Sequence, residues 1–134
     1  RMVNAAYHYF EQHGKGHIAV ISSIAGTKGL GSAPAYSATK RFQNTYIDAL
    51  DQLAHMKKLN ISFTDIRPGF VATPLLKDDK YPLLMHTSQV ASQIVKAISR
   101  RKRVAIIDWR YQLIVFFWKL IPGWLWVRLP VRNQ

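Results

Sequence analysis

The spacing of apolar residues changes several times along the chain, and each change marks a predicted element. Residues 2–12 carry apolar side chains at helical spacing, and Gly14 follows them as a residue that commonly ends helices. Residues 17–23 and 61–66 are short apolar runs with β-branched residues, which is typical of strands buried on both faces. Residues 36–56, between these runs, have the amphipathic pattern of a long helix.

The same alternation continues to residue 108. Residues 25–34 are rich in Gly and Ser, which indicates a loop. Thr87 or Ser88 is expected to cap a helix that runs to Ser99, and residues 104–108 predict a third strand. Helices that alternate with strands predict an α/β fold with parallel strands and right-handed crossovers. Three strands leave a sheet edge open, so we expect the chain to need another half or a partner for stability.

Two of the predicted helices are expected to turn one face toward the core. In residues 36–56 the expected apolar stripe consists of Phe42, Tyr46, Ala49, Leu50 and Leu53. In the later helix the residues expected to face inward are Val90, Ile94, Val95 and Ile98.

Composition and charge separate the end of the chain from the rest. The 134 residues have a net charge of +12 and include no cysteine, which excludes disulfides, thiolate catalysis and cysteine-rich zinc sites. Residues 100–134 contain eight Lys or Arg residues, the single acid Asp108 and all four tryptophans. We therefore expect a catalytic unit over residues 1–109 and an apolar, amphipathic helical extension over residues 110–134.

This extension has two possible roles. Its uncharged stretch, residues 111–118, is far shorter than the about 20 apolar residues that span a bilayer. Tryptophan interleaved with arginine suits the headgroup region, so the composition predicts a cytoplasmic protein with peripheral contact to a membrane surface. The alternative is a helix docked on its own domain or on a dimer partner. Nucleic-acid binding is not expected, because the aromatic residues lie in one continuous apolar run.

Three residues form a candidate acid–base site. Tyr36 and Lys40 are four positions apart in the predicted helix and so share one face, where the ammonium group favours ionisation of the phenol. Ser23, at the end of the preceding strand, can hydrogen-bond the same substrate oxygen, and its neighbour Ser22 competes for that role. The competing interpretation is a Tyr–Lys pair on the surface of an ordinary helix.

The spacing of these residues resembles the short-chain dehydrogenases/reductases. Ser23, twelve intervening residues, Tyr36-x-x-x-Lys40 and then the segment 67–73 match that family's order, and residues 3–108 can be laid on its second half. The resemblance implies the C-terminal half of a Rossmann-like, doubly wound parallel sheet. It also implies a reaction that interconverts a carbonyl and an alcohol with NAD or NADP.

The resemblance also implies a role for each site residue. Tyr36 would exchange the proton, Lys40 would hold the nicotinamide ribose hydroxyls, and Ser23 would orient the substrate oxygen. The cofactor-binding residues carried over from the family are Tyr36, Lys40, Pro68, Gly69, Val71 and Thr73. Membrane-associated, hydroxysteroid-dehydrogenase-like members are similar in carrying apolar C-terminal extensions.

Two parts of the family pattern are missing from the chain. It contains no glycine-rich turn for the cofactor pyrophosphate and no counterpart of the family's catalytic asparagine. We therefore expect the C-terminal half of a longer enzyme, inactive in isolation, and the choice between NAD and NADP stays open. The alternative is a non-catalytic membrane-associated or interaction domain with a vestigial site.

The partners are predicted from two segments. The apolar segment 75–85 suggests a lid over a lipophilic carbonyl or alcohol substrate. An equally favoured alternative is a loop that covers the core and has no role in specificity. By resemblance, the helix 36–56 and the helix 2–12 would build a homodimer or homotetramer. The five histidines show no metal-binding spacing, so no metal site is predicted.

Overall fold

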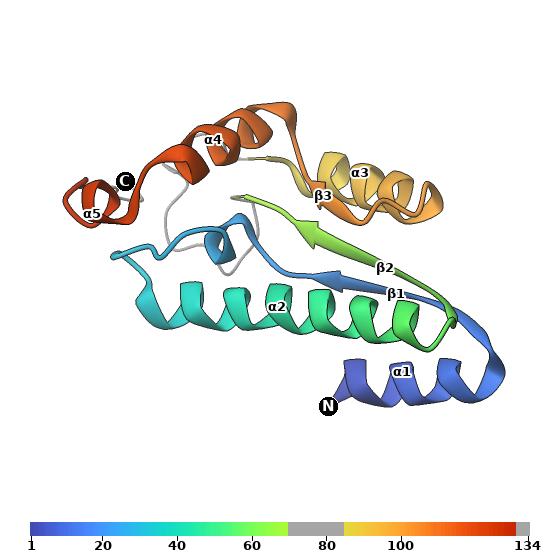
Figure 1. The fold of residues 1–134 in the computed structure, drawn as a ribbon. Coiled ribbons are helices and arrows are strands. Elements are labelled where there is room, and N and C mark those ends of the chain that lie inside the picture. The colour runs from blue at the N-terminus through green and yellow to red at the C-terminus, as the bar shows by residue number, and fades with distance from the viewer. Residues whose placement is uncertain (70–84, 131–134) are drawn as a thin grey trace.

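A three-stranded parallel sheet forms the centre of the computed structural model, which describes residues 1–69 and 85–130 (Figure 1). The strand order is β1-β2-β3. The strands are β1 (Lys15–Ile21), β2 (Asn60–Arg67) and β3 (Val104–Ile106). Lys15 pairs with Asn60 at one end of the β1–β2 ladder and Ile21 with Ile66 at the other. The predicted α/β fold with parallel strands is confirmed.

Helices cover both faces of this sheet. Figure 1 shows α1 and α2 on one side and α3 and α4 on the other, with a short 3-10 turn, η1, after β1. The bounds are α1 (Met2–His13), η1 (Ile24–Gly26), α2 (Pro34–Met56), α3 (Thr87–Ser99), α4 (Trp109–Leu120) and α5 (Gly123–Trp126). Gly14 ends α1 in the left-handed conformation, with φ 82°, as the sequence predicts.

One core lies between α1, α2 and the first two strands. Its buried residues are Tyr7, Ile18, Ile47, Leu50, Ala54, Ile61 and Phe63. The predicted stripe on α2 is partly wrong, because Phe42 is 69% exposed and Ala49 is also exposed. The helix is rotated so that its inward face passes through Ser37, Asn44 and Ile47, which leaves Tyr46 and Leu53 at the border of the core.

The second core lies between α3, α4 and the opposite face of the sheet. Its buried residues are Ile24, Ile66, Met85, Val90, Ile107, Tyr111 and Val115. Val95 was expected to face this core but is 66% exposed, whereas Ala97 is buried. The helical stripe through Val90, Ile94 and Ala97 leaves no room for Val95, which points about 100° away from Ile94.

Two predicted element ends also differ from the structure. The N-cap position of α3 is His86, so neither Thr87 nor Ser88 occupies it. β3 ends at Ile106, and Asp108, expected in the strand, caps α4 instead by accepting a hydrogen bond from the Arg110 amide. Asp108 has a φ of 76°. This backbone conformation ends the extended chain and allows the turn into α4.

Candidate active site

Ser23 lies at the carboxyl end of β1, where the chain turns into η1. Its extended backbone, with φ −167°, places the hydroxyl to accept a hydrogen bond from the Ala25 amide at 3.1 Å. The same hydroxyl lies 3.5 Å from the carbonyl oxygen of Pro68, which also accepts from the Ile24 amide at 3.2 Å. The ends of β1 and β2 therefore bring Ser23 beside the Pro68–Gly69 segment.

Tyr36 and Lys40 lie on the first two turns of α2. Pro34 occupies the first turn of this helix, where its fixed φ and missing amide proton are tolerated. Lys40 Nζ lies 5.5 Å from the centroid of the Tyr36 ring, and the Tyr36 side chain is 51% exposed. The predicted pair therefore shares one face of the helix and is open to a ligand.

Ser37 joins this pair to the loop that follows Ser23. Its buried hydroxyl lies 2.5 Å from the carbonyl oxygen of Ala25 and 2.7 Å from that of Lys28, and it accepts a bond from the Leu30 amide at 3.1 Å. One side chain thus organises both ends of the loop between the predicted serine and the predicted tyrosine.

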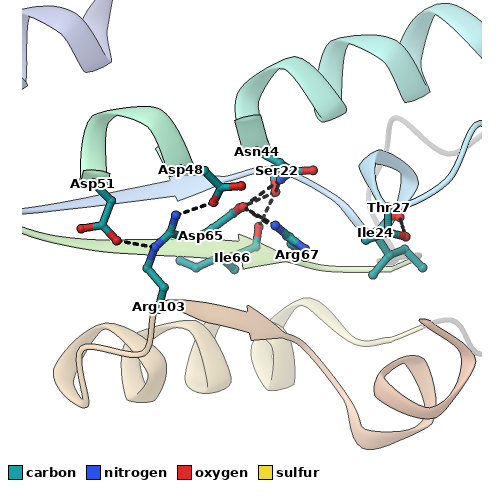
Figure 2. Close-up of polar contacts among 10 residues, drawn as sticks. All are labelled: Ser22, Ile24, Thr27, Asn44, Asp48, Asp51, Asp65, Ile66, Arg67 and Arg103. Atoms are coloured by element: carbon teal, nitrogen blue, oxygen red, sulfur yellow. Dashed lines mark hydrogen bonds and ion pairs between the residues drawn. The ribbon is translucent and has the colours of Figure 1, made fainter. Parts of the chain in front are cut away.

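Ser22 does not point to the same place as Ser23. Its hydroxyl donates to Asp65 Oδ1 at 2.5 Å and accepts from Asn44 Nδ2 at 2.9 Å (Figure 2). Arg67 donates to Asp65 Oδ2 from Nε at 3.1 Å and from its terminal nitrogen at 3.0 Å. Asn44, Asp65 and Arg67 were not predicted from the sequence as a group. An acid and an arginine two positions apart in an apolar strand are the signal that could have found them.

Gly69 packs against the tail of the chain. A side chain at this position would collide with the ring of Tyr111, so only glycine fits between the end of β2 and α4. Of the other predicted cofactor contacts, Val71 and Thr73 lie outside the described residues. The same holds for residues 75–84 of the expected lid, whereas Met85 is described and buried.

The helices of the tail are bonded to the loop between Ser23 and Tyr36. Trp118 Nε1 donates to Thr27 Oγ1 at 2.9 Å, and Trp126 Nε1 donates to the carbonyl oxygen of Gly29 at 2.7 Å. Lys28 donates from Nζ to the carbonyl oxygen of Ile121 at 2.8 Å. One face of the tail therefore docks on its own domain.

Charge near the start of α4 is locally balanced. The Arg110 guanidinium, hydrogen-bonded to Asp108, lowers the pKa of that carboxyl group against the opposing effect of burial.

Across residues 1–69 and 85–130, no three His, Asp or Glu side chains gather where they could hold a metal ion. In the same part of the chain, no helix combines the length and apolar character needed to cross a bilayer.

The family model for short chain dehydrogenase matches residues 1–82, more than half of the chain. The protein therefore belongs to the short-chain dehydrogenase/reductase family, as the spacing of Ser23, Tyr36 and Lys40 suggests.

Individual relatives and solved structures agree with this assignment. An uncharacterized oxidoreductase of Myxococcus xanthus is 30% identical over 111 residues, which cover 81% of this chain and 43% of that protein. Sepiapterin reductase of Chlorobaculum tepidum is 28% identical over 108 residues, which cover 78% and 43%. A short chain dehydrogenase/reductase of Burkholderia phymatum, crystallised with NAD, superimposes with a TM-score of 0.65 at 15% identity over 93% of this chain and 52% of that one. The chain thus spans less than half the length of these two curated relatives.

Proposed function

We propose that the protein is an NAD(P)-dependent oxidoreductase that interconverts a carbonyl and an alcohol on a lipophilic substrate. The observation that carries this proposal is the meeting of three segments. Ser23 lies beside Pro68 at the ends of two parallel strands, and Ser37 ties the Tyr36–Lys40 turn of α2 to the loop from Ser23. Ligands of open α/β sheets bind at the carboxyl ends of their strands, which is where these segments lie.

The residues present fit a nicotinamide nucleoside. No carboxylate forms an ion pair with Lys40 in the described parts of the chain, so its ammonium group is available to ribose hydroxyls. The half-exposed Tyr36 lies beside it. The cofactor would supply or accept the hydride.

The protein itself handles the proton and the substrate oxygen. In reduction, the Tyr36 hydroxyl donates its proton to the carbonyl oxygen as that oxygen gains negative charge. The nearby Lys40 ammonium stabilises the phenolate that remains, and the Ser23 hydroxyl orients the substrate oxygen. Oxidation of the alcohol runs the same transfers in reverse, with the phenolate as the base.

Nucleotide binding and turnover test this proposal. We would measure NADH and NADPH fluorescence and the reduction of lipophilic ketones with the full-length protein that carries this chain. Tyr36→Phe should abolish turnover and keep nucleotide binding, whereas Tyr46→Phe on the same helix should keep both. Tyr46 is a matched control, because among the described residues its hydroxyl bonds to Asn4 at 3.5 Å and to no residue of the proposed site. Full turnover by Tyr36→Phe would refute the mechanism, and a protein that binds neither nucleotide would support the non-catalytic alternative.

We also propose a homodimer or homotetramer through the α1–α2 face. Phe42 is exposed and stacks on Tyr46, with ring centroids 6.0 Å apart, and Met2 at the start of α1 is 83% exposed. These side chains line one hollow with β1, which offers an apolar surface to a second copy. Sedimentation of the protein and of Phe42→Ser should show loss of the oligomer in the variant.

A second surface supports peripheral contact between this proposed cytoplasmic enzyme and a membrane. α4 is apolar on both sides: Tyr111 and Val115 are buried in the domain, and a second stripe faces outward. The large apolar residues exposed on α4, α5 and just beyond are Trp109, Leu113, Phe116, Phe117, Leu120, Trp124, Val127 and Leu129. Residues 109–130 contain no acid, and Arg128 lies 6.0 Å from the Trp124 ring, so the surface is suited to anionic headgroups.

Vesicle sedimentation tests this contact. The protein should pellet with phosphatidylcholine vesicles that contain phosphatidylserine, and the double change Phe116→Ser and Phe117→Ser should abolish pelleting. Tyr9→Ser, a change of an exposed aromatic residue on α1 and so on the opposite side of the sheet, is the matched control. Equal pelleting of the double variant and the parent would exclude the outer stripe of α4 as the binding face.

A further inference from the structure

Four buried polar residues lie directly behind the proposed site and have no part in the proton transfer. We infer that Ser22, Asn44, Asp65 and Arg67 are positioning residues, which set the direction of the Ser23 hydroxyl and the place of the Pro68–Gly69 backbone. This inference rests on the proposed oxidoreductase function. It assigns a role in the reaction to residues that touch neither substrate nor cofactor.

The group joins the three elements that carry the site. Ser22 is the residue after β1, Asp65 and Arg67 are in β2, and Asn44 is on α2, one turn after Lys40. Asn44 Nδ2 donates to Asp65 Oδ2 at 2.8 Å as well as to the Ser22 hydroxyl, so it bonds to the end of both strands (Figure 2). Their exposed fractions are 0% for Asp65 and 2–7% for the other three. These four side chains are therefore almost fully shielded from solvent.

Each bond acts on a neighbour that belongs to the proposed site. Successive side chains of an extended chain point to opposite sides, so holding Ser22 against Asp65 directs the Ser23 side chain the other way. Arg67, held by two bonds to the same carboxylate, immediately precedes Pro68. The Pro68 carbonyl oxygen is in turn the group that lies 3.5 Å from the Ser23 hydroxyl. The carboxylate thus fixes both sides of that contact.

Stability alone is a weak reason for such a group. A buried ion pair loses so much solvation that apolar residues of the same volume often serve a fold equally well. Asn44 Oδ1 is buried and has no hydrogen-bond partner among the described atoms, which adds a further cost. What the polar set provides and an apolar set cannot is direction, because charge-assisted hydrogen bonds fix the orientation of the groups they join. An error of about 1 Å in the position of a catalytic group costs roughly 100-fold in rate.

Kinetics of two small substitutions test the inference. Asp65→Asn keeps the shape and removes the charge, and Ser22→Ala removes one hydroxyl from a chain that should still fold. We expect kcat to fall roughly 10- to 100-fold in both, because the Ser23 hydroxyl loses its direction, and the Kd of the nucleotide to rise in Asp65→Asn, which also frees Arg67 beside the Pro68–Gly69 backbone. Ser22→Thr, which restores a hydroxyl, should recover part of kcat.

The matched controls are Asp48→Asn and Asp51→Asn on α2. These carboxylates bind Arg103 at 2.5 and 2.8 Å, away from the site, so their loss should lower the unfolding midpoint and leave kcat unchanged (Figure 2). Lower midpoints with an unchanged kcat in Ser22→Ala and Asp65→Asn would overturn the inference and leave the proposed function intact. A parent protein that binds neither nucleotide would instead refute the proposed function and this inference together.

Discussion

Gly26 offers the sharpest test of how the loop from Ser23 packs on α2. A Cβ placed on Gly26 would lie 2.8 Å from the carbonyl carbon of Lys40 and 2.9 Å from the amide nitrogen of Arg41, where an ordinary contact is at least 3.4 Å. Both atoms belong to helix backbone and cannot turn away. The same Cβ would collide with Asn44 Oδ1, and the Asn44 amide is held by Ser22 and Asp65.

The cost of Gly26→Ala follows from this geometry. The loop must move away from α2 by at least half an ångström, and forcing one extra carbon into a packed site costs about 1–3 kcal/mol. The displaced loop follows Ser23 and packs on the turn of α2 that carries Lys40, so we expect turnover to fall together with stability. Urea unfolding measures the stability, with the shift in midpoint interpreted at constant slope.

Gly29→Ala is the matched control in the same loop. Nothing lies within 4 Å of a Cβ at Gly29, and its φ is not in the left-handed region. The change should leave stability unaltered or raise it by about 0.4–1 kcal/mol, because alanine restricts the unfolded chain. Equal unfolding midpoints for Gly26→Ala and Gly29→Ala would refute the packing argument.

Two further predictions concern the tail and the pH dependence of stability. Trp126→Phe removes the hydrogen bond to the Gly29 carbonyl oxygen and should lower the free energy of unfolding by about 1 kcal/mol. Amide hydrogen exchange should become faster in residues 25–31 and nowhere else. Unchanged exchange in these residues would contradict the role of the bond. Burial and then the Arg101 charge lower the pKa of His17 from 6.5, so the unfolded chain binds its proton first as the pH falls. The contribution of neutral His17 to the free energy of unfolding should therefore be complete above pH 6.5 and decline below it. His17→Gln should remove this part of the pH dependence of stability.

The fold could be predicted because parallel strands leave a simple pattern. The run that became β1 is easily found because residues 18–21 are all apolar, although the structure leaves Ala19 and Ile21 exposed. β2 is buried over most of its length and has apolar residues at 61, 63 and 66. Which face of each helix is buried was harder to predict. α2 has apolar residues on two overlapping stripes, and the choice between Phe42 and Ile47 depends on how the helix lies across the sheet.

The site was predicted as a set of residue types at a family spacing, and its supporting groups were not. Asn44 looks like a surface residue of an amphipathic helix, and only the three-dimensional structure brings it to Ser22 and Asp65. The tail shows the same limit. Residues 113–118 of α4 are all apolar, so the sequence does not show which face of the helix is buried. Composition alone therefore could not choose between docking on the domain and facing a membrane.

The bonds from the tail to the loop have a consequence for how the protein is made. Trp118 and Trp126 reach Thr27 and Gly29 across 91 and 97 residues of chain. During synthesis at about 5–20 residues per second, the loop between Ser23 and Tyr36 therefore waits several seconds for the partners that hold it. β1 and its loop are made before α4 and α5, so this part of the proposed site is completed only after those two helices have been synthesised.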